Sequence, residues 1–315
     1  MQSCICVSDV IDYPSVIYMK KQLTGTLFLC VAVLIWGSTF VAQSVGMDSV
    51  GPFTFQAARC VLAVLFLLPV IAVFEIRDIK NYFRKWRSKK LWIAGALCGI
   101  ALFAASSLQQ ISLVDTDAGK AGFLTALYVV LVPVIGLFLG KKPSITIVIS
   151  IFLSVIGLYL LSCMGVTTIS TGDLLLLGCA LAFAVQITLI DRFGSDVDGL
   201  QLNCIQCLVV ALLSGIFMFA TETPKMPDIL SCWLPIGYAG VLSMGVAYSL
   251  QVLGQQRIEP TTASIIMSLE SVIAALSGWL ILQETMTFWE LIGCALVFIA
   301  VILSQIQPKK KKPQV

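Results

Sequence analysis

The feature that most constrains this chain is a series of ten apolar stretches, each close to the length that crosses a lipid bilayer. An α-helix needs ~20 residues to span ~30 Å of hydrocarbon. Backbone groups in hydrocarbon must be hydrogen-bonded within their own segment, so these stretches are predicted to be helices. The sequence therefore predicts an all-α integral membrane protein with ten transmembrane helices, at residues 23–45, 53–75, 91–112, 120–140, 144–163, 172–191, 199–220, 232–253, 261–282 and 288–306.

Composition agrees with a lipid environment and argues against enzyme chemistry. Of the residues 58% are hydrophobic and 12% are charged, about half the charged fraction of soluble proteins. Histidine is absent, which removes the commonest general base and metal ligand. Cys204-x-x-Cys207 has the spacing of a zinc or redox pair, but it lies in an apolar run with no second pair, so we interpret it as structural. We expect no catalytic residue, no metal and no cofactor.

The distribution of basic residues predicts the orientation of the chain. With the N-terminus inside, the inside segments hold 17 of the 20 Lys and Arg residues, whereas Lys225 is outside and Arg59 and Lys120 belong to helices. The positive-inside rule then predicts a multi-pass protein of the cell (inner or plasma) membrane with both termini in the cytoplasm. The basic stretch 77–90 is interpreted as a topology-setting loop in contact with headgroups, and no nucleic-acid partner is expected.

The two ends of the chain lie outside the predicted helices. Residues 1–22 are expected to form a disordered N-terminal tail, and Met19, which opens the segment MKKQLTG, is expected to be the start of translation. Residues 1–18 lack the basic-then-apolar order of a signal peptide. Residues 307–315 are expected to be a basic cytoplasmic tail.

The chain repeats itself. A shift of 147 residues places the first two helices on the sixth and seventh, so that Trp36 meets Phe183 and Arg59 meets Gln206. A shift of 142 residues places helices three to five on eight to ten, so that Gln109 meets Gln251. The two shifts differ by five residues where the first half has its longer basic loop. The predicted repeats are residues 23–163 and 171–306.

The number of helices in each repeat decides how the repeats are related. Five is odd, so the second repeat enters the membrane from the opposite side and the two repeats are inverted. Inverted repeats are typical of secondary transporters, in which exchange of the two halves' conformations gives alternating access.

Several segments resemble a known family. They are Leu34–Val41 (LIWGSTFV), Ala57-Ala-Arg59, Ser268–Leu276 (SLESVIAAL), Gly278-Trp-Leu and Gln283-Glu284. With these the chain resembles the EamA-type members of the drug/metabolite transporter superfamily over about residues 20–306. It departs from the family at Ser271, where a proline is usual, and at Lys142, where an acidic residue is usual. The resemblance implies a ten-helix metabolite exporter, driven by a gradient or by exchange, with a central cavity lined by helices 1–4 and 6–9.

The polar residues of the predicted helices indicate where such a cavity lies. Helical spacing places Trp36, Thr39 and Gln43 on one face of helix 1, and amides in lipid need partners that a shared cavity provides. For any one glutamine the alternative is a hydrogen bond that holds two helices together. The predicted substrate cavity comprises Trp36, Thr39, Gln43, Gln56, Arg59, Gln109, Thr125, Tyr128, Gln186, Asn203, Gln206, Tyr248 and Gln251.

Two charged residues of the predicted helices need separate treatment. Arg59 in helix 2 is expected to face the interior, where it attracts anions or pairs with Asp48; the alternative is a side chain that reaches the outer headgroups. Glu270 in helix 9 is a candidate proton-coupling residue, because a carboxyl at this depth alternates between a neutral and a paired, charged form. Its alternatives are a structural hydrogen bond or an ion pair with Arg59.

The predicted function is secondary transport, with export of a small, amino-acid-like or other organic metabolite by alternating access around the central cavity. The expected partners are this substrate, the lipid bilayer, and a coupling proton or counter-substrate; the oligomeric state stays open. The alternatives are a channel and a membrane-embedded enzyme acting on lipid or isoprenoid substrates.

The predicted topology has a direct test. Single cysteines in loops on the two sides should react with a membrane-impermeant thiol reagent only from their own side, because the bilayer excludes the reagent. Labelling at Lys142 from outside intact cells would contradict five helices per repeat. The expected outside positions are Asp48, Asp117 and Lys225, and the expected inside positions are Lys85, Lys142 and Arg257.

Overall fold

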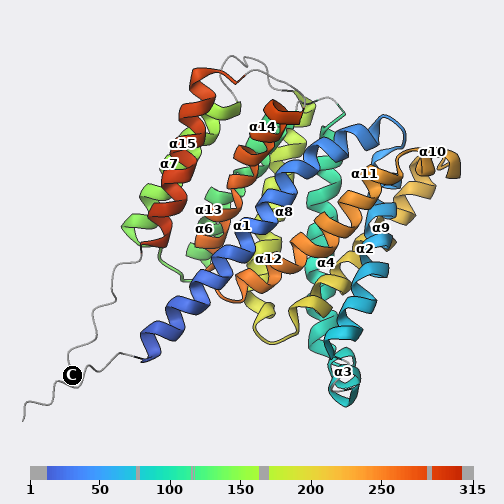
Figure 1. Cartoon of the computed structure of the whole chain (residues 1–315), viewed down its shortest axis with the longest axis horizontal. Helices are drawn as coiled ribbons and strands as arrows, with labels where there is room; N and C mark the ends of the chain where they lie inside the picture. The colour runs from blue at the N-terminus through green and yellow to red at the C-terminus, as the bar shows by residue number, and fades with distance from the viewer. Residues whose placement is uncertain are drawn as a thin grey trace, which may run out of the picture.

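The computed structural model describes residues 13–75, 79–114, 116, 118–162, 170–281 and 286–306, and it is a bundle of helices (Figure 1). The first half of the chain forms α1 (Tyr13–Met47), α2 (Pro52–Glu75), α3 (Ile79–Trp86), α4 (Lys89–Ser112), α5 (Ala118–Ala126), α6 (Tyr128–Phe138) and α7 (Ile145–Ser162). The second half forms α8 (Thr171–Gly194), α9 (Gly199–Thr221), α10 (Met226–Ser231), α11 (Trp233–Gly237), η2 (Tyr238–Ala247), α12 (Tyr248–Gln255), α13 (Pro260–Met267), α14 (Leu269–Ile281) and α15 (Phe288–Gln305).

Ten apolar helical segments in the described part of the chain match the ten apolar stretches of the sequence. Among the described residues, nine segments are long and apolar enough to cross a membrane, and the shorter apolar helix Ile145–Leu161 is the tenth. Three of the nine are composite, formed by α5 with α6, by α11, η2 and α12, and by α13 with α14. The predicted all-α membrane fold, with ten helices in two inverted five-helix repeats, is confirmed.

Two glutamates make the inverted relationship visible in the packing of α2 against α9. The Glu222 carboxylate, at the end of α9, accepts hydrogen bonds from the backbone N–H groups of Phe53 and Thr54 at the start of α2, both at 2.8 Å. Glu75, at the end of α2, accepts a bond from Gln201 at the start of α9, at 3.3 Å. The shift of 147 residues relates Glu75 to Glu222 and Thr54 to Gln201. The last turn of each helix therefore holds the first turn of the other, as an antiparallel, two-fold-related pair requires.

Helices 4 and 9 are each broken, and the expectation of continuous helices at 120–140 and 261–282 is wrong in this respect. The first helix is interrupted at Leu127 and the second at Ser268, positions that the repeat relates to within one residue. At Ser268 the hydroxyl bonds back to the Ile265 carbonyl at 2.7 Å, which competes with regular helical bonding. Pro133 lies six residues beyond the first break, inside α6.

The eighth membrane segment also departs from the regular helix expected at 232–253. Its middle, η2, is a π-helix of 10 residues. Such wide turns are rare and leave backbone carbonyls without their usual helical donors, and they occur often at functional sites. The counterpart in the first repeat, α4, is a regular α-helix.

The first helix begins earlier than expected. α1 starts at Tyr13 rather than at residue 23, so the part of the expected tail from residue 13 onward is helical. Pro14 stands in the first turn, where a missing N–H costs nothing, and no residue between it and the apolar run breaks a helix. Met19 lies inside α1. Residues 1–12 and the basic tail 307–315 lie outside the described residues.

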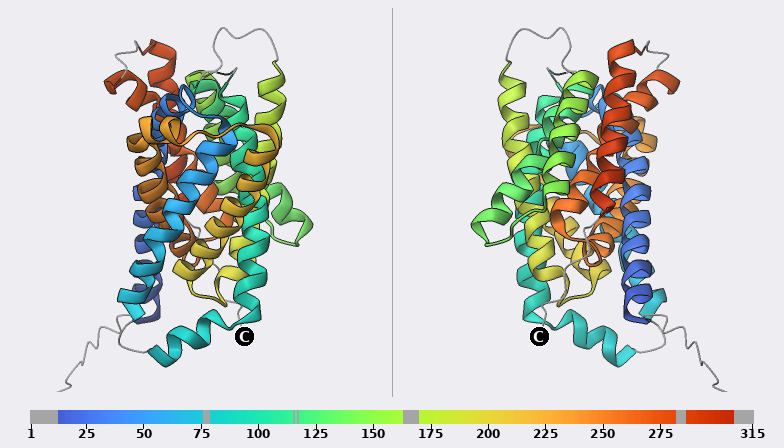
Figure 2. Two further views of the ribbon diagram at one scale, coloured as in Figure 1. Left: turned by 90° about the vertical axis from the view of Figure 1, so that its right-hand side faces the viewer. Right: turned by 90° about the vertical axis from the view of Figure 1, so that its left-hand side faces the viewer.

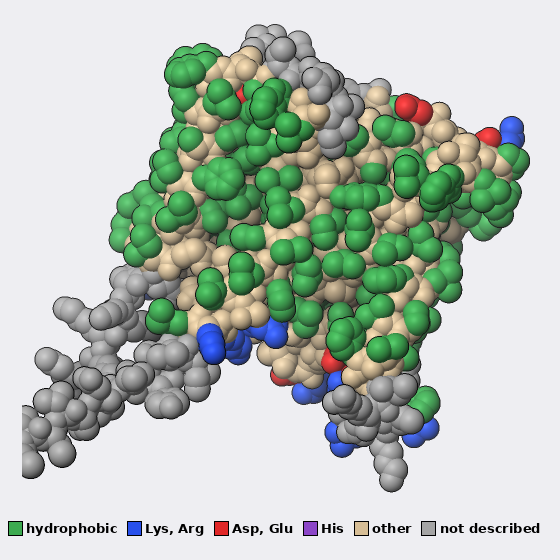
Figure 3. Space-filling model, in the orientation of Figure 1, with side chains coloured by type: hydrophobic (Ala, Val, Ile, Leu, Met, Phe, Trp, Pro, Cys, Tyr) green, Lys and Arg blue, Asp and Glu red, His purple; other side chains and the backbone are tan. Residues whose placement is uncertain are grey.

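Charged side chains separate the two faces of the bundle. We call the end that carries α3 the basic face; its described basic residues include Lys85, Lys141, Arg192 and Arg257, and α3 runs along this end (Figure 2). Figure 3 shows most visible Lys and Arg side chains gathered there, below a surface that is largely hydrophobic. The opposite end, with Lys120, Glu222 and Lys225, is the Lys120 face. A broad apolar band between two polar ends is the surface that a bilayer covers.

An ion-pair network ties the two repeats on the basic face. Lys85 of α3 hydrogen-bonds to Glu75 of α2 and, at 2.9 Å, to Asp198, which caps α9. Burial by itself lowers the pKa of Lys85, but its hydrogen bonds to the two carboxylates outweigh burial and raise this pKa. Lys85 therefore stays charged throughout the physiological pH range.

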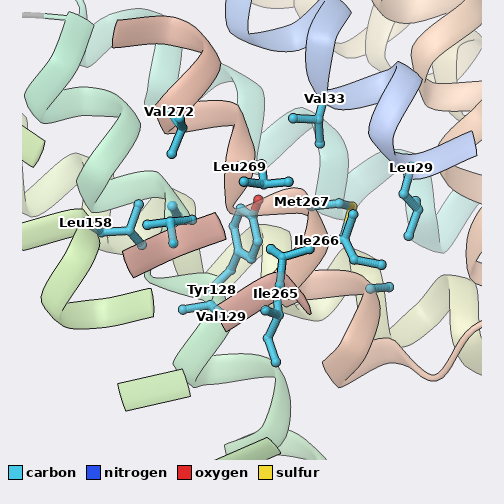
Figure 4. Packing of buried hydrophobic residues seen from close by; sticks show 14 of the residues in the cluster. Leu29, Val33, Tyr128, Val129, Leu158, Ile265, Ile266, Met267, Leu269 and Val272 are labelled. Atoms are coloured by element: carbon cyan, nitrogen blue, oxygen red, sulfur yellow. The ribbon is translucent and has the colours of Figure 1, made fainter. Parts of the chain in front are cut away.

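Close helix packing holds the core together at two places. Figure 4 shows Tyr128 and Val129 of α6 against Ile265 and Leu269 of α13 and α14, within the largest apolar cluster. At the edge of the bundle α7 and α15 meet through Gly157 and Gly293, where a Cβ built on Gly293 would lie 2.5 Å from the Gly157 carbonyl oxygen. Glycines at such a crossing let two backbones touch.

This crossing generates a stability prediction. The substitution Gly293→Ala should force α15 away from α7 and lower the free energy of unfolding by about 1–3 kcal/mol. Gly215→Ala is the matched control, because its Cβ would meet nothing within 4 Å and alanine favours helix over glycine. The measurement is thermal unfolding of purified protein in detergent. Equal melting temperatures for the two variants would contradict the close contact.

Candidate functional site

A polar cavity lies where the membrane helices of the two repeats converge. It leaves about 40 Å³ for the centres of water-sized molecules, room for roughly three waters. It is enclosed mainly by helices rather than loops, which hold side chains in fixed positions. The lining residues are Trp36, Thr39, Phe40, Gln43, Arg59, Gln109, Tyr128, Phe183, Ile187, Ser243, Met244, Tyr248, Gln251, Met267 and Glu270.

The structure places the polar residues singled out from the sequence in two layers. The first layer lines the cavity and comprises Trp36, Thr39, Gln43, Arg59, Gln109, Tyr128, Tyr248, Gln251 and Glu270. The second layer is buried behind the lining and comprises Gln56, Thr125, Gln186, Asn203 and Gln206.

Sequence reasoning missed the apolar part of the lining, such as Phe40, Phe183 and Ile187. An apolar residue in an apolar helix carries no signal of its own. The internal repeat does carry one, because Phe183 is the counterpart of Trp36 and Ile187 is the counterpart of Phe40. Projection of Trp36 onto the other repeat finds Phe183, whereas Phe40 and Ile187 are both apolar and are found only after one of them is known.

Arg59 is buried and held by amides. Its side chain is 2% exposed, and the two terminal nitrogens donate to the side-chain oxygens of Gln43 and Gln56. The guanidinium also lies 5.6 Å from the centre of the Phe55 ring. Arg59 therefore faces the interior, and its partners are amides rather than the exposed Asp48 or Glu270. Neutral partners orient the guanidinium and leave its positive charge uncompensated, which suits it for an anionic ligand group.

A chain of buried amides crosses the cavity wall. Gln251 donates to Gln186 at 3.1 Å, Gln186 donates to Gln206 at 3.4 Å, and Gln206 donates to Asn203 at 2.7 Å. Thr125 accepts a bond from Gln109 at 3.3 Å on another wall. Such connected bonds fix the lining amides in one arrangement.

Asn203 completes the hydrogen bonding of the π-helix. Its amide nitrogen donates to the carbonyls of Met244 and Gly245, at 3.0 and 3.2 Å, and contacts the Ser249 hydroxyl at 2.9 Å. One side chain of α9 thus supplies the donor to carbonyls of η2. Because Met244 and Ser243 line the cavity, this contact sets the shape of the lining.

The two helix breaks bring Tyr128 and Glu270 to the cavity. Tyr128 is the first residue of α6, and Glu270 lies in the first turn of α14; the shift of 142 residues makes them counterparts. The N-terminus of a helix favours a negative group, so the break stabilises the Glu270 carboxylate when it is charged. Glu270, Tyr128 and Tyr248 all line the same cavity. Discontinuous helices at the repeat interface are how transporters build ligand sites.

Several polar atoms of the lining have no hydrogen-bond partner among the described residues. They are the Trp36 indole nitrogen, the Tyr128 hydroxyl, the Gln251 side-chain oxygen and the Arg59 Nε. Buried polar atoms without partners cost free energy. Their presence on one cavity indicates a site whose polar groups are completed by water or by a ligand.

The chemistry of this site is that of recognition. The described residues contain no cluster of His, Cys, Asp and Glu that would hold a metal ion. Arg59, a basic side chain, and Glu270, an acidic one, both line this cavity, together with aromatic rings and amides. The Trp36 and Tyr248 rings, 4.9 Å apart, supply the aromatic part. Such a site can bind and orient a small polar molecule.

The fold and the site together define a class of protein. Two inverted five-helix repeats that converge on a polar cavity are the architecture of a membrane transporter. The chain belongs to the EamA-like transporter family, whose model matches residues 23–163 and 170–305. It is accordingly a multi-pass membrane transporter of small molecules.

Individual relatives agree with this assignment. An uncharacterized transporter of Archaeoglobus fulgidus is 31% identical over 289 residues, 91% of this chain and 87% of that protein. The threonine/homoserine exporter RhtA of Escherichia coli K12 is 29% identical over 143 residues, 42% of this chain and 47% of that protein. A crystal structure with 21% sequence identity has the same fold, with a TM-score of 0.75 over 90% of this chain and 96% of the other.

The contact between Asn203 and the π-helix leads to a prediction. Asn203→Leu keeps a similar volume but leaves the Met244 and Gly245 carbonyls without this donor, which should cost about 1–3 kcal/mol of stability. Hydrogen exchange of residues 238–247 should become faster. Gln255→Leu is the matched control, since Gln255 donates to only one carbonyl, that of Ile187 in a regular helix. Unchanged exchange in the Asn203 variant would show that η2 does not depend on this side chain.

Proposed function

We propose that the protein exports a small zwitterionic, amino-acid-like metabolite by alternating access around the central cavity. The observation that carries the proposal is the pair of opposite charges, Arg59 and Glu270, that line one cavity without pairing with each other. A zwitterion satisfies both charges at once, with its carboxylate at Arg59 and its ammonium group at Glu270. A singly charged solute leaves one of them uncompensated and a neutral solute leaves both, which is costly in a site of low polarity.

The position of the two charges in the repeats supports a fixed orientation of the substrate. The repeat counterpart of Arg59 is Gln206, and that of Glu270 is Tyr128, so neither charge has a charged counterpart. The positions that line the substrate cavity are therefore related by the repeat, but its two charges are not. A zwitterion binds to such a cavity in one orientation and keeps it as the two halves exchange conformations.

The direction of transport and the membrane are part of the same proposal. A partial relative carries the name of a threonine/homoserine exporter, which supports export. Basic residues gather on the basic face, which supports a cell membrane protein with this face and both termini in the cytoplasm. The protein exchanges its substrate across this membrane with a proton or a counter-substrate.

Glu270 is proposed as the coupling site. When the amino group of the substrate leaves Glu270, the Glu270 carboxylate has no partner in a poorly solvated cavity. A proton then neutralises this carboxylate. A proton and the substrate thus compete for the same carboxylate. This competition links movement of one to movement of the other, as coupled exchange requires.

Counterflow in proteoliposomes tests the substrate class. Vesicles loaded with unlabelled threonine should accumulate labelled threonine transiently. The amino acid should compete with this uptake, whereas its amine and hydroxy-acid analogues, which each lack one charge, should compete about 10- to 100-fold less well. Competition by the hydroxy acid as strong as by the amino acid would exclude a zwitterion site. Flux without saturation or trans-stimulation would indicate a channel.

Glu270→Gln tests the coupling role. Glutamine keeps the shape and the hydrogen-bonding capacity but does not titrate, so the pH dependence of net transport should disappear. Exchange should persist at higher substrate concentration only, because the ammonium group loses its charged partner. Gln109→Asn is the control, because it leaves every charge in place and should keep the wild-type pH profile. Gln251→Glu would not serve, because it adds a charge. A pH profile of Glu270→Gln that matches the wild type would remove Glu270 from the coupling mechanism.

A further inference from the structure

The inverted repeat allows each contact that closes one end of the bundle to be compared with its counterpart at the other end. On the Lys120 face, Gly172 of α8 packs so closely on the segment after α4 that an added Cβ would lie 2.2 Å from the Thr116 hydroxyl. On the basic face, Gly25 of α1 packs on the segment after α12, where a Cβ would lie 2.8 Å from Ile258. The repeat relates Gly25 to Gly172 and Thr116 to Ile258, so these are the same contact made twice.

One of the two closing contacts carries an ion pair. Beside Gly172, the ammonium group of Lys120 in α5 lies 2.6 Å from the carboxylate of Asp173 in α8. The two side chains are only 16% and 8% exposed. Asp173 is held in place by the capping box of α8, in which its carboxylate accepts the backbone N–H of Ser170 at 2.8 Å. The pair joins the first repeat to the second.

The counterpart contact on the basic face has a charged residue, Arg257, beside Gly25, but its guanidinium donates to the Leu253 carbonyl and makes no ion pair among the described residues. The shift of 147 residues places Asp173 on Thr26, and the shift of 142 places Lys120 on Thr262. The Thr26 hydroxyl donates to the Gln22 carbonyl, at 3.1 Å, and to Gln305, at 3.2 Å. The Lys120–Asp173 ion pair is therefore present at only one of two contacts that the repeat relates to each other.

The basic face has inter-repeat ion pairs of its own, Lys85–Asp198, Lys90–Asp196 and Lys141–Asp191, and each is more exposed than the Lys120–Asp173 pair. Lys85 and Asp198 are 33% and 26% exposed, and the repeat counterpart of Asp198 is Gly51. This pair lies between α3 and the start of α9, away from the contact made by Gly25. It offers a comparison with the same two residue types at the other end of the molecule.

We propose that Lys120 and Asp173 form a latch that holds the cavity closed on the Lys120 face. The proposal rests on the alternating access described above. Two inverted repeats with identical closing contacts populate their two end states equally, and a difference between the contacts shifts this balance. Opening at the Lys120 face separates α5 from α8 and breaks the ion pair, so the pair favours the state that is closed there. Lys120 and Asp173 act on access to the cavity and do not contact the substrate.

The test measures how fast a cysteine in the cavity reacts from each face. The reporter is Thr39→Cys, a nearly isosteric change in the cavity lining, and the protein without the reporter corrects for native cysteines. Membrane vesicles of both orientations are treated with a membrane-impermeant maleimide. The exposed positions Lys225→Cys and Lys89→Cys identify which face is outward in each preparation.

Loss of the latch should change labelling on one face only. Lys120→Met and Asp173→Asn should each raise the labelling rate from the Lys120 face about fivefold, and the double variant should raise it by less than the two effects combined, because both single variants lose the same ion pair. Lys120→Arg keeps the charge and should stay close to the parent. Asparagine at position 173 retains an acceptor for the Ser170 N–H, which protects the helix cap.

Two controls separate the latch from general loosening. Lys85→Met removes one of the inter-repeat Lys–Asp pairs of the basic face and should leave labelling from the Lys120 face unchanged. Thr26→Asp combined with Thr262→Lys installs the pair at the counterpart contact and should lower labelling from the basic face. Melting temperatures of all variants establish that each is folded.

The outcomes distinguish the latch from the transport model. Normal sidedness of the parent with no change in the Lys120 and Asp173 variants would overturn the latch alone, as would an equal increase in Lys85→Met. A parent reporter that reacts at the same rate from both faces would overturn alternating access, and the latch with it, because nothing would then be closed on the Lys120 face.

Discussion

The structure depends on one constraint: a polar group placed in hydrocarbon must find a partner inside the protein. Backbone groups satisfy it by forming helices, and polar side chains satisfy it by facing one another. The buried amides Gln186, Asn203, Gln206 and Gln251 therefore form a connected chain rather than separate contacts. Some of the atoms that this network leaves without a partner, such as the Tyr128 hydroxyl, lie on the cavity wall. At the cavity, water or a ligand provides the hydrogen-bond partners that the protein does not.

The inverted repeat arranges these polar groups in pairs. Gln109 and Gln251 face the cavity from opposite repeats, as do Tyr128 and Glu270. Symmetry of this kind provides two equivalent ways to pack the same helices, which is the physical basis of alternating access. The charged residues that differ between the two repeats determine the proposed chemistry. Charges without charged counterparts in the cavity define the proposed substrate, and the ion pair at one closing contact is the proposed latch.

Helix irregularities connect the packing to the site. The breaks at Leu127 and Ser268 place the start of a helix, with its positive end, at the cavity wall. The π-helical turn of η2 frees carbonyls that Asn203 then binds. A membrane helix tolerates such irregularity only where neighbouring side chains satisfy the freed groups. The irregular segments therefore lie inside the bundle and beside the cavity.

The sequence by itself determined the ten helices, the two inverted repeats and the family, because helix length, the shift between repeats and the odd helix count are properties of the chain alone. It also singled out the polar residues of the site, since each is conspicuous in an apolar helix. Only the tertiary structure decided which of them line the cavity and which stand behind it, and that Arg59 bonds to Gln43 and Gln56. The same holds for the helix breaks, for η2 and for the contact between Lys120 and Asp173. These depend on distances between segments far apart in the chain, which no local pattern of residues encodes.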